Sequence, residues 1–500
     1  MKTESNHQYA TIFVVIVTAF VTSFSSSAMT LAIPSIGLEF DSKATLLGWL
    51  MSGYMICVAM FAVPFGRIAD LTGRRRVFLI GIISFSVFNG LTFFAWNLAV
   101  VIFLRVMQGF TAAMVFSTNN PILIDAFPPE KRGKVLGYSV TAIYAGLSTG
   151  PVIGGLINHY LGWRYIFLFT VAVGLFAIVV ALTKLPKTPS TKLPNASSAK
   201  LPETSSTKLP EASLTKLPEA TSDHVEKIKG AFNVTGNLMY ISAIFCIMYG
   251  FTLFGESTIA KVLIPIGIAI GVLFVLHEQR TEKPIVKMSL FKGNMSFLLS
   301  NMAALFNYGA TFAVGYLMSL YLQLILGYTS STAGFILITQ PLVMALVSPW
   351  AGRASDKVSP FKLASAGMGL CAATLLSYTF LGIDGHVAHI IINLTVIGVG
   401  FGLFSSPNTN AVMSCVGKED YGVASSILTT MRTLGHTSSM AIITLIMSAH
   451  LGTLTLTQAT PEQLVTTMHT CFIVFSAICL VGVFISLQRK TKHLERDRQI

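Results

Sequence analysis

The chain has 500 residues, of which 53% are hydrophobic and only 11% are charged, and its net charge is +13. A typical soluble chain carries about 25% charged residues, so this chain has too few polar side chains to cover a surface in water. The positive charge does not indicate nucleic-acid binding, because the basic residues lie in short clusters between apolar runs and not on one soluble face. The composition excludes a soluble globular protein and predicts one embedded in lipid.

Fourteen apolar runs are long enough to cross a bilayer, which takes roughly 20 residues in a helix. In lipid the backbone satisfies its own hydrogen bonds only in helices or closed barrels, and runs of this length without strict alternation exclude a barrel. We therefore predict an all-α polytopic membrane protein with fourteen transmembrane helices. The predicted spans are 10–33, 46–65, 77–96, 98–123, 135–159, 165–183, 232–254, 259–276, 296–322, 331–349, 363–381, 388–407, 423–448 and 465–487.

The distribution of lysine and arginine predicts the orientation of these helices. With a cytoplasmic N-terminus, only Lys43, Arg164 and Lys261 of the 34 Lys and Arg residues lie in outer loops. Arg105 and Arg432 lie inside spans, which leaves 29 in the inner segments. Loops rich in these residues stay in the cytoplasm. We therefore expect both termini in the cytoplasm and the protein in the plasma membrane.

A polar segment interrupts the apolar pattern after the sixth span. The tripeptide Lys-Leu-Pro recurs there every eight residues, at Lys184, Lys192, Lys200, Lys208 and Lys216. Regular prolines oppose a helix and the few leucines cannot form a core, so we expect a semi-extended cytoplasmic spacer; a partner-binding repeat is the alternative. The chain then divides into an N-terminal six-helix bundle, this linker, two additional helices and a C-terminal six-helix bundle, at residues 1–183, 184–230, 231–277 and 278–500.

Two related segments follow the second and tenth spans, at the same predicted face. The first reads GRIADLTGRRR and the second GRASDK. Glycines allow a tight reversal, and Asp70 can pair with the arginines or with the positive end of a helix from the other half. Such a contact can form in one conformation and break in another, which predicts a gate latch; topology charges alone are the alternative. The latch residues are Gly66, Arg67, Asp70, Gly73, Arg74, Arg75, Arg353 and Asp356.

The fourth and fifth spans carry two further patterns. Arg105 lies in LRVMQGFTAA, and because a charge costs about 2.5–3.5 kcal/mol at a helix centre, it should face the bundle interior or a wet cavity. Snorkelling from the helix end is the alternative. The fifth span contains GLSTGPVIGG, whose small residues allow close helix approach and whose proline allows a kink. Its key residues are Gly146, Gly150, Pro151, Gly154 and Gly155.

Together these patterns resemble the signature motifs of the major facilitator superfamily. GRIADLTGRRR is similar to the loop motif between helices two and three, LRVMQGFTAA to the helix-four motif, and GLSTGPVIGG to the helix-five motif that marks antiporters. Fourteen spans, with two inserted between the halves, resemble the drug/proton antiporter branch of multidrug exporters. The resemblance implies alternating-access transport by two six-helix halves related by pseudo-symmetry.

One departure from that branch concerns proton coupling. Its members usually have an aspartate in helix one, nine residues before the proline that matches Pro34, and this chain has Ser25 there. A membrane carboxylate both binds cationic drugs and carries a proton, so coupling here needs another carrier. His436 is the candidate, because it lies one turn after Arg432 on the same helix face and imidazole titrates near neutrality. A histidine that only bonds a neighbouring helix is the alternative.

Polar residues at membrane depth are candidates for contacts with a substrate. Those facing a central cavity would orient an amphiphilic molecule among aromatic and methionine side chains, whereas the others would bond neighbouring helices. The candidates are Ser25, Asn119, Asn120, Asn307, Tyr308, Gln323, Gln340, Asn408 and Asn410.

The leading hypothesis is a secondary active transporter that exports amphiphilic small molecules and drugs, driven by protons or another coupling ion. One alternative is an exporter of anionic or zwitterionic metabolites that uses Arg105 and Arg432 as counter-ions. Another is a non-transporting membrane sensor or scaffold. The soluble segments contain no nucleophile motif, nucleotide loop or metal-ligand spacing, so we expect no enzyme activity, cofactor, metal or nucleic-acid partner. We expect a monomer in the lipid bilayer.

Overall fold

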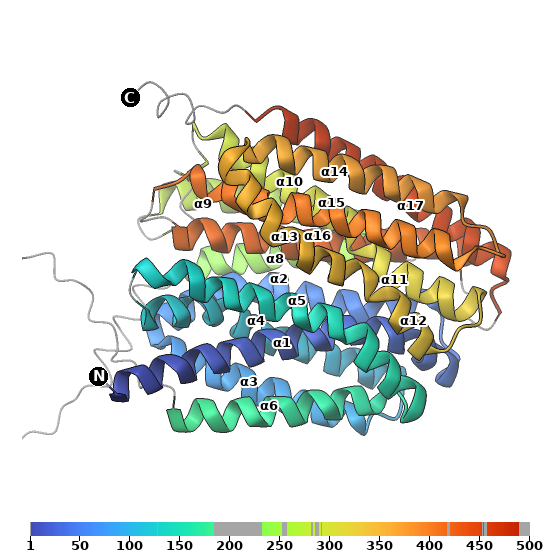
Figure 1. Cartoon of the computed structure of the whole chain (residues 1–500), viewed down its shortest axis with the longest axis horizontal. Coiled ribbons are helices and arrows are strands. Elements are labelled where there is room, and N and C mark those ends of the chain that lie inside the picture. The colour runs from blue at the N-terminus through green and yellow to red at the C-terminus, as the bar shows by residue number, and fades with distance from the viewer. Residues whose placement is uncertain are drawn as a thin grey trace, which may run out of the picture.

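The structure is a computed structural model, and it describes residues 2–127, 129–184, 233–252, 258–281, 284–285, 290–291, 293–417, 421–452, 454 and 458–489. Its regular elements are helices, which lie side by side along the long axis of the molecule (Figure 1). We call the end of the bundle where α1 begins the N-face, and the opposite end the far face. Nearly all of the predicted Lys-Leu-Pro spacer lies outside the described residues.

Six helices form the N-terminal half, and each crosses the bundle in the direction opposite to the one before it. All but α3 are longer than their predicted apolar runs, because further turns extend them at one or both ends. These helices are α1 (Lys2–Glu39), α2 (Ala44–Thr72), α3 (Arg74–Phe93), α4 (Leu98–Ala126), α5 (Pro129–Tyr160) and α6 (Arg164–Lys184).

Two inserted helices, α8 (Val234–Thr252) and α9 (Thr258–Arg280), come next along the chain. The C-terminal half follows, and three of its six spans consist of consecutive helical pieces. The pieces are α10 (Met295–Thr311), α11 (Ala313–Leu320) and η2 (Tyr321–Ile325), then α12 (Ser330–Leu337) and α13 (Thr339–Lys357), then α14 (Pro360–Ser377) and η3 (Tyr378–Phe380). The last three spans are α15 (Val387–Ser414), α16 (Tyr421–Leu451) and α17 (Pro461–Leu487).

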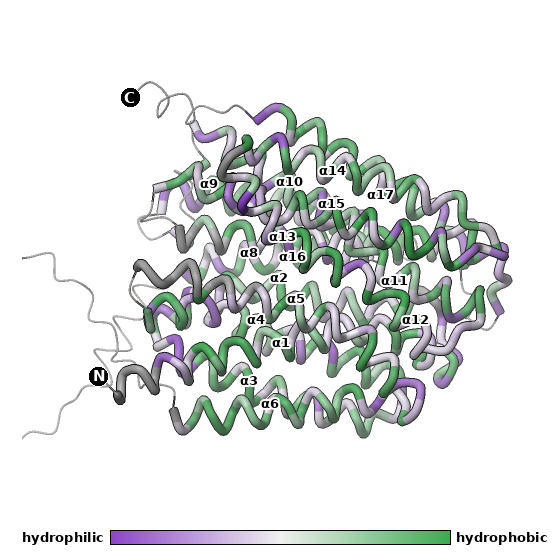
Figure 2. Tube along the Cα trace, viewed as in Figure 1, coloured by the Kyte–Doolittle hydropathy of each residue, from purple (hydrophilic) through white to green (hydrophobic). Residues whose placement is uncertain are grey.

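The structure confirms the predicted fold class. Within the described residues, thirteen helical spans are long and apolar enough to cross a membrane, and α5, with 32 residues, completes the fourteen. Polar residues gather toward the two ends of the bundle (Figure 2). Apolar side chains such as Ile259 and Val262 of α9 are exposed on its outside, as expected for a surface that lipid covers.

The two halves pack against each other through α2 with α16 and through α5 with α12. The Ser330 hydroxyl donates a hydrogen bond of 3.2 Å to the Gly155 carbonyl, and the Ser319 hydroxyl donates one of 2.7 Å to the Thr30 carbonyl. All four residues lie in the far-face part of their spans. The structure is therefore closed at the far face.

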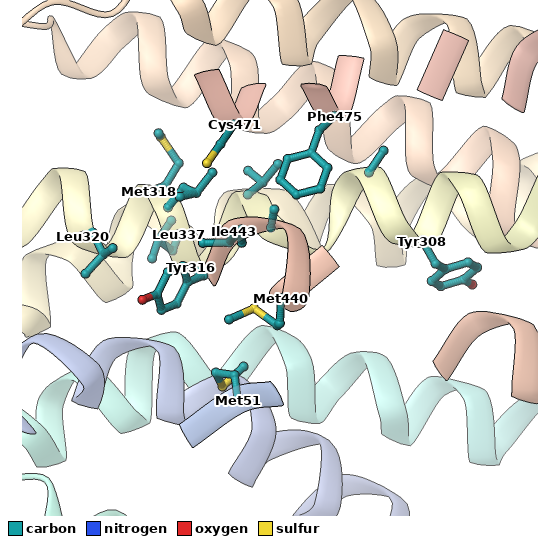
Figure 3. Close-up of a cluster of buried hydrophobic side chains, with 14 of the residues drawn as sticks. Met51, Tyr308, Tyr316, Met318, Leu320, Leu337, Met440, Ile443, Cys471 and Phe475 are labelled. Carbon is teal, nitrogen blue, oxygen red and sulfur yellow. The ribbon is translucent and has the colours of Figure 1, made fainter. Parts of the chain in front are cut away.

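The apolar core continues from one half into the other. Met51 of α2 and Met440 of α16 belong to the same buried cluster, together with Tyr316 and Ile443. Figure 3 shows residues of this cluster, and Tyr308, which belongs to the same cluster, lies to one side of the others in the view. The buried apolar packing between the halves therefore extends as far as Tyr308.

The inserted helix α8 lies over the seam between α2 and α16. Its Tyr240 hydroxyl donates a hydrogen bond of 2.9 Å to the Ala59 carbonyl of α2, and the side chain of Thr430 in α16 makes a hydrogen bond with the same hydroxyl. Leu434 of α16 packs against the apolar cluster that contains Tyr240. A single tyrosine therefore contacts one helix from each half.

Candidate functional site

Arg432 is a half-buried cation in α16, within the membrane-spanning part of the bundle. Its Nη2 donates a hydrogen bond of 2.6 Å to the Thr409 hydroxyl, and its guanidinium carbon lies 5.2 Å from the centre of the Tyr308 ring. The buried Nε has no hydrogen-bond partner among the described residues, and no described carboxylate pairs with this arginine. Arg432 therefore presents unused N–H donors that a ligand with an acceptor group can satisfy.

His436 lies one turn after Arg432, at the middle of α16. Its ring stacks on Phe312, with 4.3 Å between the ring centres, and meets the edge of Tyr308 at 5.3 Å. Neither ring nitrogen makes a hydrogen bond with a described residue. The alternative that this histidine bonds a neighbouring helix is therefore not supported in this state, since its neighbours are aromatic faces.

Tyr144 and Ser405 complete this group, and neither is among the residues predicted from the sequence. The Tyr144 hydroxyl at the middle of α5 lies 3.1 Å from the Ser405 hydroxyl of α15, and the Tyr308 hydroxyl of α10 lies 3.0 Å from the same oxygen. Phe401, one turn before Ser405, meets the Tyr308 ring at 5.0 Å. A tyrosine and a serine inside apolar spans give no sequence signal, and only the docking of the two halves brings them together.

Arg105 lies in the interior of the bundle. It is 0% exposed, its Nε donates a hydrogen bond of 3.0 Å to the Leu50 carbonyl, and its Nη1 donates one of 2.9 Å to Gln108. Tyr54 covers it, with 4.5 Å between the guanidinium carbon and the ring centre. This arginine therefore does not reach the Arg432 group in this state, and snorkelling from the helix end is excluded.

The latch segment at the N-face forms a shorter reversal than the sequence predicts. Its first residues, including Gly66 and the half-buried Arg67, continue α2, and only Gly73 makes the turn, with a φ of 107° that favours glycine. Arg74 forms ion pairs of 2.8 Å with Asp70 and 2.7 Å with Asp125. Asp70 therefore pairs within its own half in this state.

The remaining latch candidates lie near the same face. Arg75 donates a hydrogen bond of 3.3 Å from its Nη2 to the Leu182 carbonyl at the end of α6. Arg353 is exposed near the end of α13, and the side chain of Asp356 lies outside the described residues. A contact of Asp70 with the C-terminal half stays a prediction for another state.

The glycines of the fifth span serve two interfaces. A Cβ atom at Gly146 would lie 2.5 Å from the Phe20 carbonyl oxygen, and those at Gly150 and Gly154 would meet Ser27 and Ala28, all in α1. A Cβ at Gly155 would instead collide with the Ser330 carbonyl of α12. The Pro151 carbonyl packs against Gly334 of α12 so closely that a Cβ atom at Gly334 would collide with it. The motif therefore joins α5 to α1 and to the other half.

Most of the polar substrate candidates make contacts within the protein. Asn119 accepts a hydrogen bond of 3.2 Å from Thr18, Asn120 accepts one of 3.5 Å from Ser139, and Gln323 donates one of 2.9 Å to Ser319. Asn410 donates one of 2.6 Å to Ser355. Ser25 and Asn307 are buried in α1 and α10, and Gln340 is half-buried in α13. Of the nine candidates, the described contacts bring only Tyr308 together with Arg432 and His436.

Asn408 instead holds a buried arginine that follows α17. Arg489 donates a hydrogen bond of 2.7 Å to the Asn408 Oδ1, one of 3.2 Å to the Ser300 hydroxyl and one to the Ser486 hydroxyl. Burial lowers the pKa of Arg489 to about 10. The residue therefore stays charged at neutral pH and ties the ends of α10, α15 and α17 together.

The fold and the mid-depth group define a membrane transport protein, because a charged and aromatic site lies between two helical halves that close over it at one face. The sequence model of the Major Facilitator Superfamily matches residues 15–440 and 300–499, and the chain belongs to this superfamily. It is a multi-pass membrane transporter and not an enzyme.

Curated relatives agree with this assignment. The riboflavin transporter RibZ of Clostridioides difficile is 24% identical over 97% of this chain and 98% of its own length. The multidrug resistance protein Stp of Mycobacterium tuberculosis is 25% identical over 87% of this chain and 74% of its own length. The tetracenomycin C resistance and export protein of Streptomyces glaucescens is 23% identical over 89% of this chain and 77% of its own length.

Solved structures share the fold. A bacterial homologue of the human lysosomal transporter Spinster, in an inward-facing and unoccupied conformation, aligns with a TM-score of 0.66 and 12% identity over 98% of both chains. The peptide transporter POT in complex with sulfate aligns with a TM-score of 0.65 and 15% identity, over 96% of this chain and 94% of the other.

Proposed function

We propose that this transporter exports amphiphilic small molecules by alternating access, in exchange for protons. The observation that carries the proposal is the group formed by Arg432, His436 and Tyr308 at mid-depth, which Tyr144 reaches from the opposite half. Relatives named for multidrug resistance and tetracenomycin C export support an amphiphilic cargo. The riboflavin transporter among the relatives supports a flat aromatic one.

The group combines what such a cargo needs. Phe312, Phe401 and Tyr308 offer aromatic faces to an apolar ring, and Arg432 offers N–H donors to an acceptor on the ring's edge. Because the halves are closed at the far face in this structure, the site changes sides when that closure opens and another forms at the N-face. The predicted latch around Asp70 and Arg353 would form in that second state.

His436 is the proposed proton carrier. No described carboxylate lies in the Arg432 group, and Ser25 stands where the antiporter branch has an acid. An imidazole can take up a proton from one side and release it on the other. The positive charge of Arg432 on the same helix face opposes a second charge beside it. Exchange requires that cargo and proton exclude each other, and an aromatic cargo packed against His436 would cover the imidazole and disfavour its charged form.

We place the N-face in the cytoplasm, because 29 Lys and Arg residues lie in the segments predicted at that side. The transporter then acts in the plasma membrane with both termini inside the cell. Export follows if external protons enter while substrate leaves. The bilayer is its partner, and a monomer contains both halves that form the site.

A resistance profile of expressing cells tests the proposal. Cells that produce the wild-type chain should tolerate several amphiphilic compounds that inhibit cells producing Arg432→Ala, at equal amounts of protein in the membrane. Equal sensitivity of the two cell populations to every compound would refute export through this group. A chain that acts as a sensor or scaffold would give that result.

Export of anionic or zwitterionic metabolites is the second candidate function. It is favoured by the lack of a described carboxylate partner for Arg432 and by Ser25 in α1. Arg105 does not support it, because that side chain is enclosed by Tyr54 and the Leu50 carbonyl. Ser25→Asp should then shift transport from anionic towards cationic compounds, and an unchanged charge preference would speak against a role for this position.

A further inference from the structure

The contact between Tyr144 and Ser405 links the two halves at mid-depth. Ser405 is 4% exposed, and its hydroxyl lies within hydrogen-bonding distance of Tyr144 at 3.1 Å and of Tyr308 at 3.0 Å. A serine hydroxyl has one donor and two acceptor positions, so two tyrosines occupy most of its capacity. A third polar group can bind Ser405 well only if one tyrosine leaves.

The two tyrosines differ in how firmly they are held. Tyr308 comes from the C-terminal half, as Ser405 does, and its ring packs against Phe401 at 5.0 Å and His436 at 5.3 Å. It is buried, whereas Tyr144 is half-buried and comes from the N-terminal half. When the halves move relative to each other, Tyr144 moves relative to Ser405. Tyr308 keeps its position relative to Ser405, because both belong to the C-terminal half. Tyr144 is therefore the partner that can leave.

We propose that a substrate takes the place of Tyr144 at Ser405. The ligand class is a flat aromatic ring with an anionic or carbonyl edge: the ring packs against Tyr308 and Phe401, the edge meets Arg432, and a polar group binds Ser405. This inference rests on the proposed function. Binding then removes a hydrogen bond between the halves, so that occupation of the site and release of the halves occur together.

Competition of this kind predicts that removing Tyr144's hydroxyl strengthens binding. A net hydrogen bond changes an equilibrium by about threefold to tenfold, so Tyr144→Phe should bind such a ligand about threefold to tenfold more tightly. Ser405→Ala removes the shared partner and should bind it more weakly by a similar factor. An ordinary contact residue would behave differently, because its removal weakens binding.

The test uses the full-length chain in phosphatidylcholine nanodiscs and two dyes with the same ring system and opposite charge. Fluorescein is anionic and rhodamine 123 is cationic, and fluorescence anisotropy gives the Kd of each after subtraction of empty nanodiscs. The wild type should prefer fluorescein at least about tenfold, as expected for a charge-assisted contact with Arg432. Tyr378→Phe is the control, because the buried Tyr378 hydroxyl has no described partner and its ring stacks on Phe472, away from the site.

Unchanged or weaker binding of fluorescein by Tyr144→Phe would overturn the exchange at Ser405. A preference of the wild type for rhodamine 123 would overturn the ligand class. If the wild-type chain in proteoliposomes moves either dye while Tyr144→Phe keeps the wild-type Kd, the inference fails and the proposed function stands. If the wild type neither binds nor moves the dyes and confers no resistance, both fail.

Discussion

Asp70, in the last turn of α2, forms an ion pair of 2.8 Å with Arg74 in the first turn of α3. The same guanidinium reaches Asp125 of α4 at 2.7 Å, so both carboxylates bind within the N-terminal half. Ion pairs as exposed as these contribute only about 0.2–1 kcal/mol. Loss of this pair therefore changes the present state little, and a large effect of replacing Asp70 must arise in another state.

We expect Asp70→Asn to lower the transport rate at least about tenfold, while the Kd of a bound probe changes less than about threefold. The reason is that a contact made in only one state shifts the equilibrium between states and leaves the binding site intact. Asp125→Asn is the matched control, since it loses the same Arg74 but has no predicted partner in the other half. Transport rates in proteoliposomes and Kd values in nanodiscs separate the two effects. Equal losses of transport rate in Asp70→Asn and Asp125→Asn would contradict the role of Asp70 as a latch.

Tyr240→Phe tests the link that α8 makes across the seam of α2 and α16. The hydroxyl bonds the Ala59 carbonyl at 2.9 Å, and its loss removes this buried hydrogen bond between α8 and α2, so we expect about 0.5–1.5 kcal/mol less stability. The measurement is the thermal unfolding midpoint of the purified chain. Tyr249→Phe is the control, because Tyr249 contacts Trp49 through its ring. If the unfolding midpoint fell equally in both variants, the hydrogen bond of the Tyr240 hydroxyl would not be the cause of the lost stability.

Arg489→Ala should destabilise the C-terminal half, because it leaves Asn408 and Ser300 without their donor. We expect a loss of about 2–3 kcal/mol, whereas Arg353→Ala, an exposed arginine at the same face, should change stability by less than about 0.5 kcal/mol. The unfolding midpoint measures both. A midpoint of Arg489→Ala that matches the wild type would show that these hydrogen bonds carry no net stability.

The same variant has a defined pH dependence. Burial depresses the pKa of Arg489 to about 10 from its ordinary value of 12.5. Below about pH 9 this arginine is charged in both the folded and the unfolded chain, so its contribution to stability is constant there. As the pH rises through the folded-state pKa, the folded chain releases its proton first, and the cost of burying the charge declines. The deficit of Arg489→Ala should therefore be the same at about pH 6 and pH 8.

The predicted orientation is open to a labelling test. A cysteine introduced at Ser205, in a chain without its native cysteines, should react with an impermeant thiol reagent only after the cells are opened, since the Lys-rich segment is expected inside. A cysteine at His386, which is exposed at the far face, should react in intact cells. The reverse pattern would invert the topology and the direction of transport.

The fold was predictable because fourteen apolar runs of this length can cross a bilayer only as helices. The breaks at Phe312 and Ile338, which divide two spans into consecutive helices, were not predictable, since apolar residues continue through them. Glycine and proline in the fifth span predicted close packing. Which glycine meets which partner depends on helix rotation, and Gly155 proves to face the other half.

The site was predictable only where a residue is unusual for its surroundings. A charge or imidazole inside an apolar span is costly, which identified Arg432 and His436. Tyr144 and Ser405 are ordinary residues in such spans, and their pairing depends on how the halves dock. Asn408 looked like a substrate contact because its partner, Arg489, lies beyond the last apolar run, where a basic residue is expected to be solvated.

The most direct test of the proposed exchange is uptake of fluorescein into proteoliposomes with an acidic interior. Fluorescein is a weak acid, so an acidic interior does not trap it by itself. Wild-type vesicles should accumulate the dye until a protonophore removes the gradient, and His436→Gln vesicles should take it up at a rate that does not depend on the gradient. Wild-type uptake that ignores the gradient would contradict proton exchange, and a full gradient response in His436→Gln would contradict the role of His436.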